Sequence, residues 1–199
     1  MKEPMQAAID VIRGEHRALA AVMEAIKTLV ADADGPDKID FRLLWTMLYY
    51  IEAYPDRLHH PKEEQFIFSR LRERSPAAVA LIDELHRQHE AGADEIAQLR
   101  TALGHFEAGV PGAQAALRAA VQRYAEQMWA HMTTEEQQLL PLAQSHLTPD
   151  DWKHIAQAFA DNNDPVLGRQ PQAELLAVFR RIVDWAPAPL GFGGHVHKT

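Results

Sequence analysis

The sequence predicts an all-α protein, an antiparallel up-down four-helix bundle with extra helices at its C-terminal end. Apolar residues recur at three- and four-residue steps through four long segments, which is the period of an amphipathic helix. None of the long segments alternates between apolar and polar residues as a β-strand would. Short turns join the four segments, and short connections favour antiparallel neighbours.

The first two predicted helices cover about residues 7–33 and 40–75. The first has an apolar stripe that includes a histidine, and the second begins at an aspartate, a good helix cap. Pro55 and Pro61 interrupt the second helix, because proline lacks a backbone N–H and clashes with the preceding turn. We therefore expect this helix to be irregular around His59.

The third and fourth predicted helices cover about residues 77–108 and 113–146, with a turn rich in glycine and proline between them. A short helix and a last amphipathic helix follow, and the chain ends in a tail rich in proline and glycine. We assign residues 1–147 to the bundle with its metal site. Residues 148–199 are assigned to a C-terminal helical extension and loose tail that pack on the bundle.

Composition excludes several classes of protein. The 199 residues include 20 basic and 28 acidic ones, giving a net charge of −8, and no cluster of Lys and Arg stands out. This argues against a nucleic-acid or anionic-membrane partner. Cysteine is absent, which excludes disulfides, thiolate zinc sites and iron–sulfur clusters. Without an apolar leader or a run of 18 apolar residues, we expect a cytoplasmic protein. We also expect it to be a monomer or a homodimer.

One stretch contains two overlapping candidate metal-binding pairs. His59 and Glu63 are four residues apart, so on a helix they present a nitrogen and a carboxylate donor on one face. His60 and Glu64 have the same spacing and would point about 100° further round. The stretch alone leaves both registers open.

An internal repeat favours the first register. A second Glu-Glu-Gln run follows His131, the only histidine there, which stands four residues before Glu135. Both members of this pair lie 72 residues after their counterparts His59 and Glu63, and 73 residues separate His16 from His89. Two helix-pair halves thus each carry a lone histidine and a His-x-x-x-Glu pair.

Folded into a bundle, this repeat would bring four histidines and two glutamates into one interior layer. A mononuclear site does not need so many ligands, whereas two metals bridged by two carboxylates do. Imidazole and carboxylate together suit iron, with manganese or zinc possible. Burying these groups without cations would be prohibitive, so we expect the metals to stabilise the fold as well.

The ordered motifs resemble the hemerythrin-like, or HHE cation-binding, domain over about residues 7–147. The resemblance implies an antiparallel four-helix bundle and a non-haem di-iron centre with two bridging carboxylates. Its cofactor would be two iron ions with a bridging oxo or hydroxo group, and its ligands O₂, NO or peroxide. The residues that carry the resemblance are Glu15-His16-Arg17, His59-His60-Pro61-Lys62-Glu63-Glu64, His89, His131-Met132-Thr133-Thr134-Glu135-Glu136 and Leu139-Leu140-Pro141. Carried over, the metal ligands would be His16, His59, Glu63, His89, His131 and Glu135.

The sequence departs from two branches of that family. The oxygen carriers have a fifth histidine four residues from the third-helix ligand, where this chain has Leu85. His86, three residues before His89, and His60 are the possible additional ligands. The cysteine-bearing segment of the iron–sulfur-repair relatives is also missing, which weakens the case for both oxygen carriage and cluster repair.

The main functional hypothesis is a di-iron protein that binds or senses O₂ or a related molecule such as NO. The alternative is a di-iron enzyme that removes peroxide or NO, as a peroxidase, a catalase-like enzyme or an NO-reducing oxidoreductase. Ferritin-type iron storage or ferroxidase activity would need Glu-x-x-His on two helices, and that set does not occur. A metal-free structural bundle is the remaining reading, and the interior donors argue against it.

Overall fold

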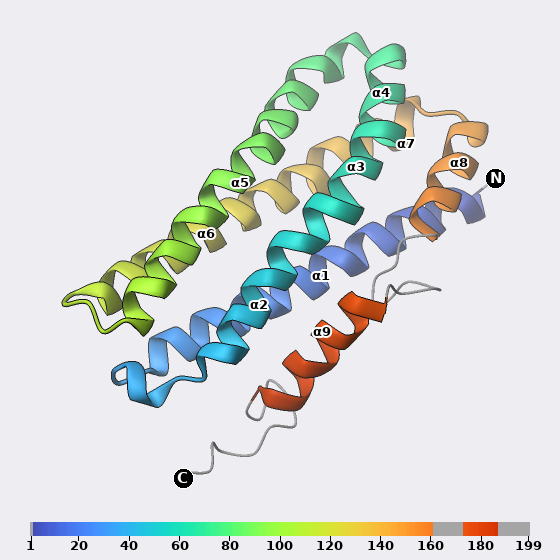
Figure 1. Cartoon of the computed structure of the whole chain (residues 1–199). Helices are drawn as coiled ribbons and strands as arrows, with labels where there is room; N and C mark the ends of the chain where they lie inside the picture. The colour runs from blue at the N-terminus through green and yellow to red at the C-terminus, as the bar shows by residue number, and fades with distance from the viewer. Residues whose placement is uncertain (1, 161–172, 187–199) are drawn as a thin grey trace.

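Four long helical rods lie side by side in the structure, a computed structural model that describes residues 2–160 and 173–186 (Figure 1). No strand occurs in these residues, so the prediction of an all-α fold is confirmed. Each rod contacts two neighbours, because α1 packs on α2 and α6, and α5 does the same. The rods are α1 (Lys2–Asp32), α2 to α4 (Phe41–Tyr54, His60–Lys62 and Ser69–Arg74), α5 (Val79–Glu107), and α6 with α7 (Ala113–Thr134 and Leu140–His146).

Local sequence explains where the rods begin and turn. The Asp40 side chain accepts a hydrogen bond of 3.2 Å from the backbone N–H of Leu43, which caps α2 as the sequence predicts. Between α5 and α6 the chain turns through Gly109 and Gly112, which have φ angles of 68° and 78°. Glycine adopts this left-handed region at little cost, so the turn can be tight. Short 3₁₀ turns, Pro36–Lys38 and Pro76–Ala78, make the other connections between rods.

The second rod is irregular, as its prolines predict. Pro55–His59 is π-helical, with the N–H of His60 bonded to the carbonyl of Pro55. Pro61 has no N–H and its ring crowds the carbonyl four residues back, which favours this wider turn. The fourth rod has the same feature in Glu135–Leu139, again two residues before a proline, Pro141. A further π-helical segment, Glu63–Phe68, has no following proline to explain it.

The buried core consists of two hydrophobic clusters. One fills the end of the bundle near the turns at residues 33–40 and 108–112, and the other fills the opposite end. Between them lies a layer of buried polar side chains, which includes His16, His59 and Glu63. The fold therefore places the predicted metal ligands in the middle of the bundle, with apolar side chains on both sides.

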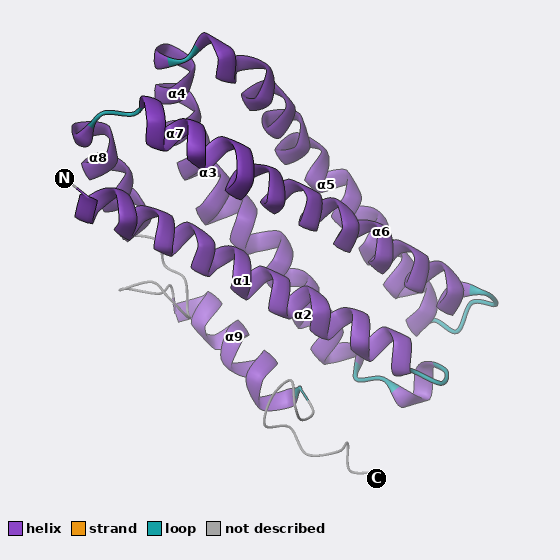
Figure 2. Ribbon diagram, turned by 180° about the vertical axis from the view of Figure 1, so that it is seen from behind, coloured by secondary structure: helices purple, strands orange, loops and turns teal. Residues whose placement is uncertain are grey.

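Two further helices lie on the outside of the rods (Figure 2). Helix α8 (Pro149–Ala160) packs on α1, and α9 (Ala173–Trp185) packs on α2. The Arg42 guanidinium lies 4.5 Å from the ring centre of Trp185, which links α2 and α9. The predicted boundary between residues 147 and 148 stays a prediction, and the tail at 187–199 lies outside the described residues. Within the described chain, no helix is long and apolar enough to cross a membrane.

Candidate metal centre

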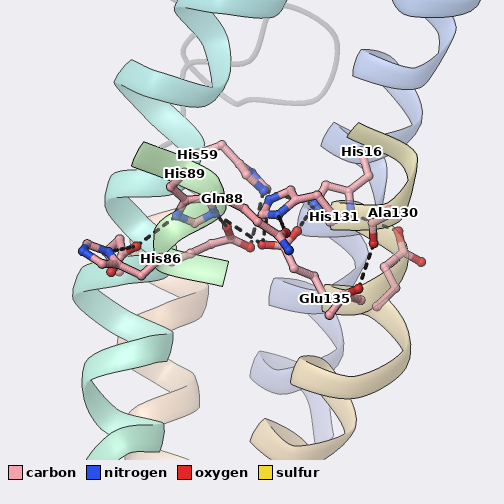
Figure 3. Close-up of polar contacts among 12 residues, drawn as sticks. His16, His59, His86, Gln88, His89, Ala130, His131 and Glu135 are labelled. Carbon is pink, nitrogen blue, oxygen red and sulfur yellow. Dashed lines mark hydrogen bonds and ion pairs between the residues drawn. The ribbon is translucent and has the colours of Figure 1, made fainter. Parts of the chain in front are cut away.

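All four rods direct donor side chains into one layer of the bundle (Figure 3). Histidines come from α1, from the second rod, from α5 and from α6, and glutamates come from the second and fourth rods. Each of the two glutamates is the first residue of a π-helical segment, Glu63–Phe68 or Glu135–Leu139. The donors form two groups, one of His16, His59, Glu63 and Glu135 and the other of His60, His89 and His131.

The first group has the spacing of ligands around one ion. Its four donor atoms all lie within 4.8 Å of one another. The Nε2 atoms of His16 and His59 are 3.1 Å apart, and His16 Nε2 is 3.2 Å from Oε2 of Glu135. Two donors at right angles, each about 2.1 Å from an octahedral ion, are separated by about 3.0 Å. The group therefore fits a metal ion at its centre.

The second group contains three histidines. The ring of His60 stacks on that of His89 with centroids 3.8 Å apart, and His131 lies edge-on to both. The Nε2 atom of His131 is 3.2 Å from Oε1 of Glu135, and that of His89 is 3.6 Å from the same oxygen. This group therefore shares a carboxylate with the first.

Each glutamate faces both groups with different oxygens. Glu63 has Oε1 at 3.4 Å from His59 Nε2 and Oε2 at 3.7 Å from His89 Nε2. Glu135 has Oε2 nearest His16 and Oε1 nearest His131. A carboxylate placed in this way can bridge two ions, one through each oxygen.

Several polar atoms of the layer are buried without a hydrogen bond. Both carboxylate oxygens of Glu63 and of Glu135, and the Nε2 atoms of His89 and His131, find no hydrogen-bond partner in the described part of the chain. Leaving a buried polar group unsatisfied costs about 1–3 kcal/mol, and more for a charged one. Two cations in the layer would satisfy all six atoms, so the residues present fit a pair of metal ions.

Outer hydrogen bonds set the tautomer of the histidines in the first group. His16 Nδ1 lies 2.9 Å from a carboxylate oxygen of Glu136, and His59 Nδ1 lies 2.5 Å from one of Glu15. Ionised carboxylates only accept, so both Nδ1 atoms carry hydrogen, and in the neutral rings the Nε2 lone pairs then face inward. In that form the two lone pairs, 3.1 Å apart, repel unless a cation, either a metal ion or a proton, lies between them.

The second group has matching outer contacts. His89 Nδ1 is 2.9 Å from Oε1 of Glu64, and His131 Nδ1 is 2.9 Å from Oε1 of Gln88. The Gln88 amide is oriented by its own N–H, which donates to Glu84 at 2.7 Å. These contacts also aim the Nε2 atoms of both rings into the layer.

The family model of the hemerythrin HHE cation binding domain matches residues 7–143. The chain belongs to this family. Searches of curated proteins and of solved structures found no match. The chain thus carries a domain whose family binds metal cations, and the donor layer described above lies within the matched residues.

The pKa shifts in this HHE domain show that the buried glutamates attract positive charge into the layer. Although burial lowers the pKa of His16, His59 and His89, the neighbouring glutamates raise all three, and that of His59 lies well above its usual value. Burial raises the pKa of Glu135, but the neighbouring imidazoles of His131, His16 and His89 hold that pKa well below its usual value. Burial and the neighbouring His89 lower the pKa of His60 well below its usual value. The carboxylate is therefore ionised and His60 neutral, which are the forms that bind a metal.

All six residues predicted as ligands lie in the layer of the HHE domain, and of the two additional candidates only His60 joins them. The side chain of His86 is 48% exposed and pairs with Glu64 and Glu90. Sequence reasoning did not assign the outer hydrogen-bond partners. Their place in the sequence could have indicated them, because Glu15, Glu64 and Glu136 are each the immediate neighbour of a residue in the donor groups.

A cavity of about 340 Å³ reaches both donor groups. Its lining includes His16 and His59 from the first group, the three histidines of the second group, and Glu135. The cavity therefore gives small molecules a space next to the donor layer of the HHE domain.

Proposed function

We propose that this HHE domain is an antiparallel, up-down four-helix bundle that holds two iron ions and binds or senses O₂ or NO. The proposed ligands are the predicted six, His16, His59, Glu63, His89, His131 and Glu135, together with His60. The observation that carries the proposal is the pair of buried glutamates, each with one unsatisfied oxygen directed to each histidine group.

The number of donors leaves room for a small molecule. The first group offers two nitrogens and one oxygen from each glutamate, while the second offers three nitrogens and the other two oxygens. An octahedral ion takes six donors, so the first ion would have two positions left and the second would have one. A single bridging ligand would fill one position on each ion. One exchangeable position would then remain, beside His16 and His59.

Iron suits both the donors and the proposed chemistry. Manganese and zinc accept the same nitrogen and oxygen ligands, so the donor set alone does not select the metal. A bound iron pair would supply reversible electron transfer to O₂ or NO, which zinc cannot. The protein's part is to fix four of the five imidazoles through their outer hydrogen bonds and to surround the layer with apolar side chains.

The test is to load the metal-free protein with Fe(II) under anaerobic conditions and count iron per chain. We expect two ions, two peaks in anomalous scattering at the iron edge, and a change in visible absorption on exposure to O₂ or NO. The proposal would be overturned by a single ion per chain, or by a loaded protein whose visible absorption does not change with either O₂ or NO.

A second candidate is an enzyme that removes peroxide or NO at the same centre. The cavity of about 340 Å³ favours it, because the space exceeds what a diatomic ligand fills. Steady-state consumption of peroxide or NO by the iron-loaded protein would support the enzyme. A loaded protein that binds NO once and then stays inert would leave binding or sensing as the function.

A further inference from the structure

The cavity beside the metal layer has the size of a site for an organic molecule. Pockets of about 300–1,000 Å³ hold drug-sized ligands, and an engineered apolar cavity of about 150 Å³ holds benzene. At about 340 Å³, this cavity is within the first range. Its exposed lining residues, among them Ala91, Gln127 and Ala130, come from α5 and α6, so the mouth lies between these two helices.

The interior of the cavity is mainly apolar. Leu19, Ile51 and Ile96 are buried and contribute aliphatic surface, and the partly buried Met128 adds a flexible side chain. The polar end is the metal layer itself, with His59 and His131. A molecule that fills the cavity needs an apolar body and one polar end.

A glycine keeps the cavity open on the α5 side. Gly92 is in the interior of that helix and lines the cavity, although glycine weakens a helix relative to alanine. Tight packing does not require this glycine, because, apart from its chain neighbours and the adjacent backbone of α5, no heavy atom of the described residues lies within 4 Å of a Cβ added there. A side chain at this position would occupy space that the cavity now contains.

Glu95 makes the cavity unfavourable for anions. It lines the cavity one turn after Ala91, and within the described residues it has neither a hydrogen bond nor an ion pair. Burial raises the pKa of its carboxyl above the usual value, because a charged group is disfavoured at this position, and the charge of a bound anion would be disfavoured for the same reason. The net charge of −8 acts in the same direction over longer range.

We propose that the cavity binds a small uncharged organic molecule with an apolar body and a hydroxyl end, seated between α5 and α6 beside the metal layer. One part of the inference rests on the proposed function: the hydroxyl would point toward the exchangeable iron position beside His16 and His59. The apolar fit depends on the cavity alone.

The test compares two identical substitutions in α5. Gly92→Leu fills the cavity, whereas Gly104→Leu places the same side chain where an added Cβ also meets no atom within 4 Å but which does not line the cavity. Both variants replace a helical glycine, so both should melt at or above the wild-type temperature. Benzyl alcohol is titrated into each protein before and after incubation with Fe(II), and binding is measured by calorimetry and by NMR of the ligand.

We expect benzyl alcohol to bind the wild type and Gly104→Leu with the same affinity. It should bind Gly92→Leu about tenfold more weakly or not at all, because the leucine side chain occupies the volume that the ligand needs. Benzoate, with the same ring and a negative charge, should bind the metal-free wild type about tenfold more weakly than the alcohol, because no iron is then present to attract its carboxylate. In Glu95→Gln that difference should shrink. No binding of benzyl alcohol to the wild type, or equal binding to both leucine variants, would overturn the inference.

The iron count and NO binding of the same three proteins separate this inference from the proposed function. Two ions and NO binding without benzyl alcohol binding would leave the proposed function intact and make the cavity only a path for gas. Benzyl alcohol binding that Gly92→Leu abolishes, in a protein that does not take up iron, would sustain the cavity site and reject the di-iron proposal.

Discussion

Two adjacent histidines serve different groups in the donor layer. His59 belongs to the first group and His60 to the second. Neighbouring helical residues point about 100° apart, so both can face the interior when it lies between their directions. Of the two His-x-x-x-Glu pairs in this stretch, both histidines therefore lie in the donor layer. Only one of the two glutamates does, because Glu64 lies outside the groups and accepts hydrogen bonds from His86 and His89.

His60→Ala and His86→Ala test this assignment as a pair. Removing His60 takes one of five donors from the second ion, so iron affinity at one site should fall by about tenfold or more. His86 is exposed and belongs to neither donor group, so its removal should leave two ions per chain. Iron titration with a competing chelator measures both variants. Equal losses would show that the histidines had been assigned wrongly.

Glu15 should be important for iron binding, because it orients the ring of the proposed ligand His59. It is fully buried and holds His59 through a contact of 2.5 Å. Glu15→Gln keeps the shape but removes the charge, and we expect iron affinity to fall about 10–100-fold. Glu24→Gln, an exposed change on the same helix, is the control. Unchanged affinity in Glu15→Gln would mean that the ring of His59 is positioned by packing alone.

The sequence predicted six of the seven donors that the structure gathers, since the repeat shift relates positions without any knowledge of contacts, and it offered the seventh, His60, as a possible addition. Their role as ligands stays a prediction. The outer partners could not be predicted in the same way, because which carboxylate meets which ring depends on how the rods are rotated. Gln88, between Glu84 and His131, is an example.

At the scale of elements, helix α8 extends the structure beyond the matched HHE residues. Its buried Phe159 lies edge-on to His59 with ring centres 6.0 Å apart. The capped start at residues 148–152 predicted a short helix here but could not say what it covers. The π-helical segments show a similar limit, since prolines explain two of them and Glu63–Phe68 has no such signal.

Phe159→Ala should therefore affect both stability and the centre. A buried phenylalanine cut to alanine typically costs about 3–5 kcal/mol, and the space left beside His59 would admit water. Denaturant unfolding measures the first effect, and the rate of iron loss to a chelator measures the second. Phe159→Leu, which keeps most of the volume, should be intermediate in both. Loss of stability with an unchanged release rate would show that α8 does not shield the metals.

The start of α8 is held by a reciprocal cap and an ion pair. Thr148 and Asp151 exchange hydrogen bonds, and Asp151 also pairs with Arg74 at 2.7 Å. Although burial raises the pKa of Asp151, its bonds with Arg74 and Thr148 lower that pKa from 3.8 to about 2. A lowered pKa gives stability that is present above the unfolded value and lost as pH falls through the folded one.

Asp151→Ala should destabilise the protein by about 1 kcal/mol at neutral pH, the usual cost of a lost cap. The difference from wild type should shrink as pH falls from 3.8 toward about 2, where the wild-type carboxyl also becomes protonated. Thermal unfolding across this range measures it, and Asp150→Ala, on the exposed side, is the control. A difference that stays constant with pH would exclude the carboxylate charge as its source.

At the scale of the whole molecule, the donor layer joins all four rods at one level. Each rod supplies at least one donor, so two bound ions would cross-link segments that are far apart in sequence. Without cations, the buried carboxylates and lone pairs of the layer work against the packing on either side. Removing the metals should therefore lower the melting temperature of the whole bundle.

The division of the core into two clusters has a consequence for cooperativity. In the metal-free protein, the clusters at the two ends are coupled only through an unsatisfied polar layer, so they should unfold partly independently. The calorimetric enthalpy should then exceed the van't Hoff enthalpy, and the two should become equal once the metals are bound. In this molecule the ions would determine whether the two halves of the bundle melt as one unit.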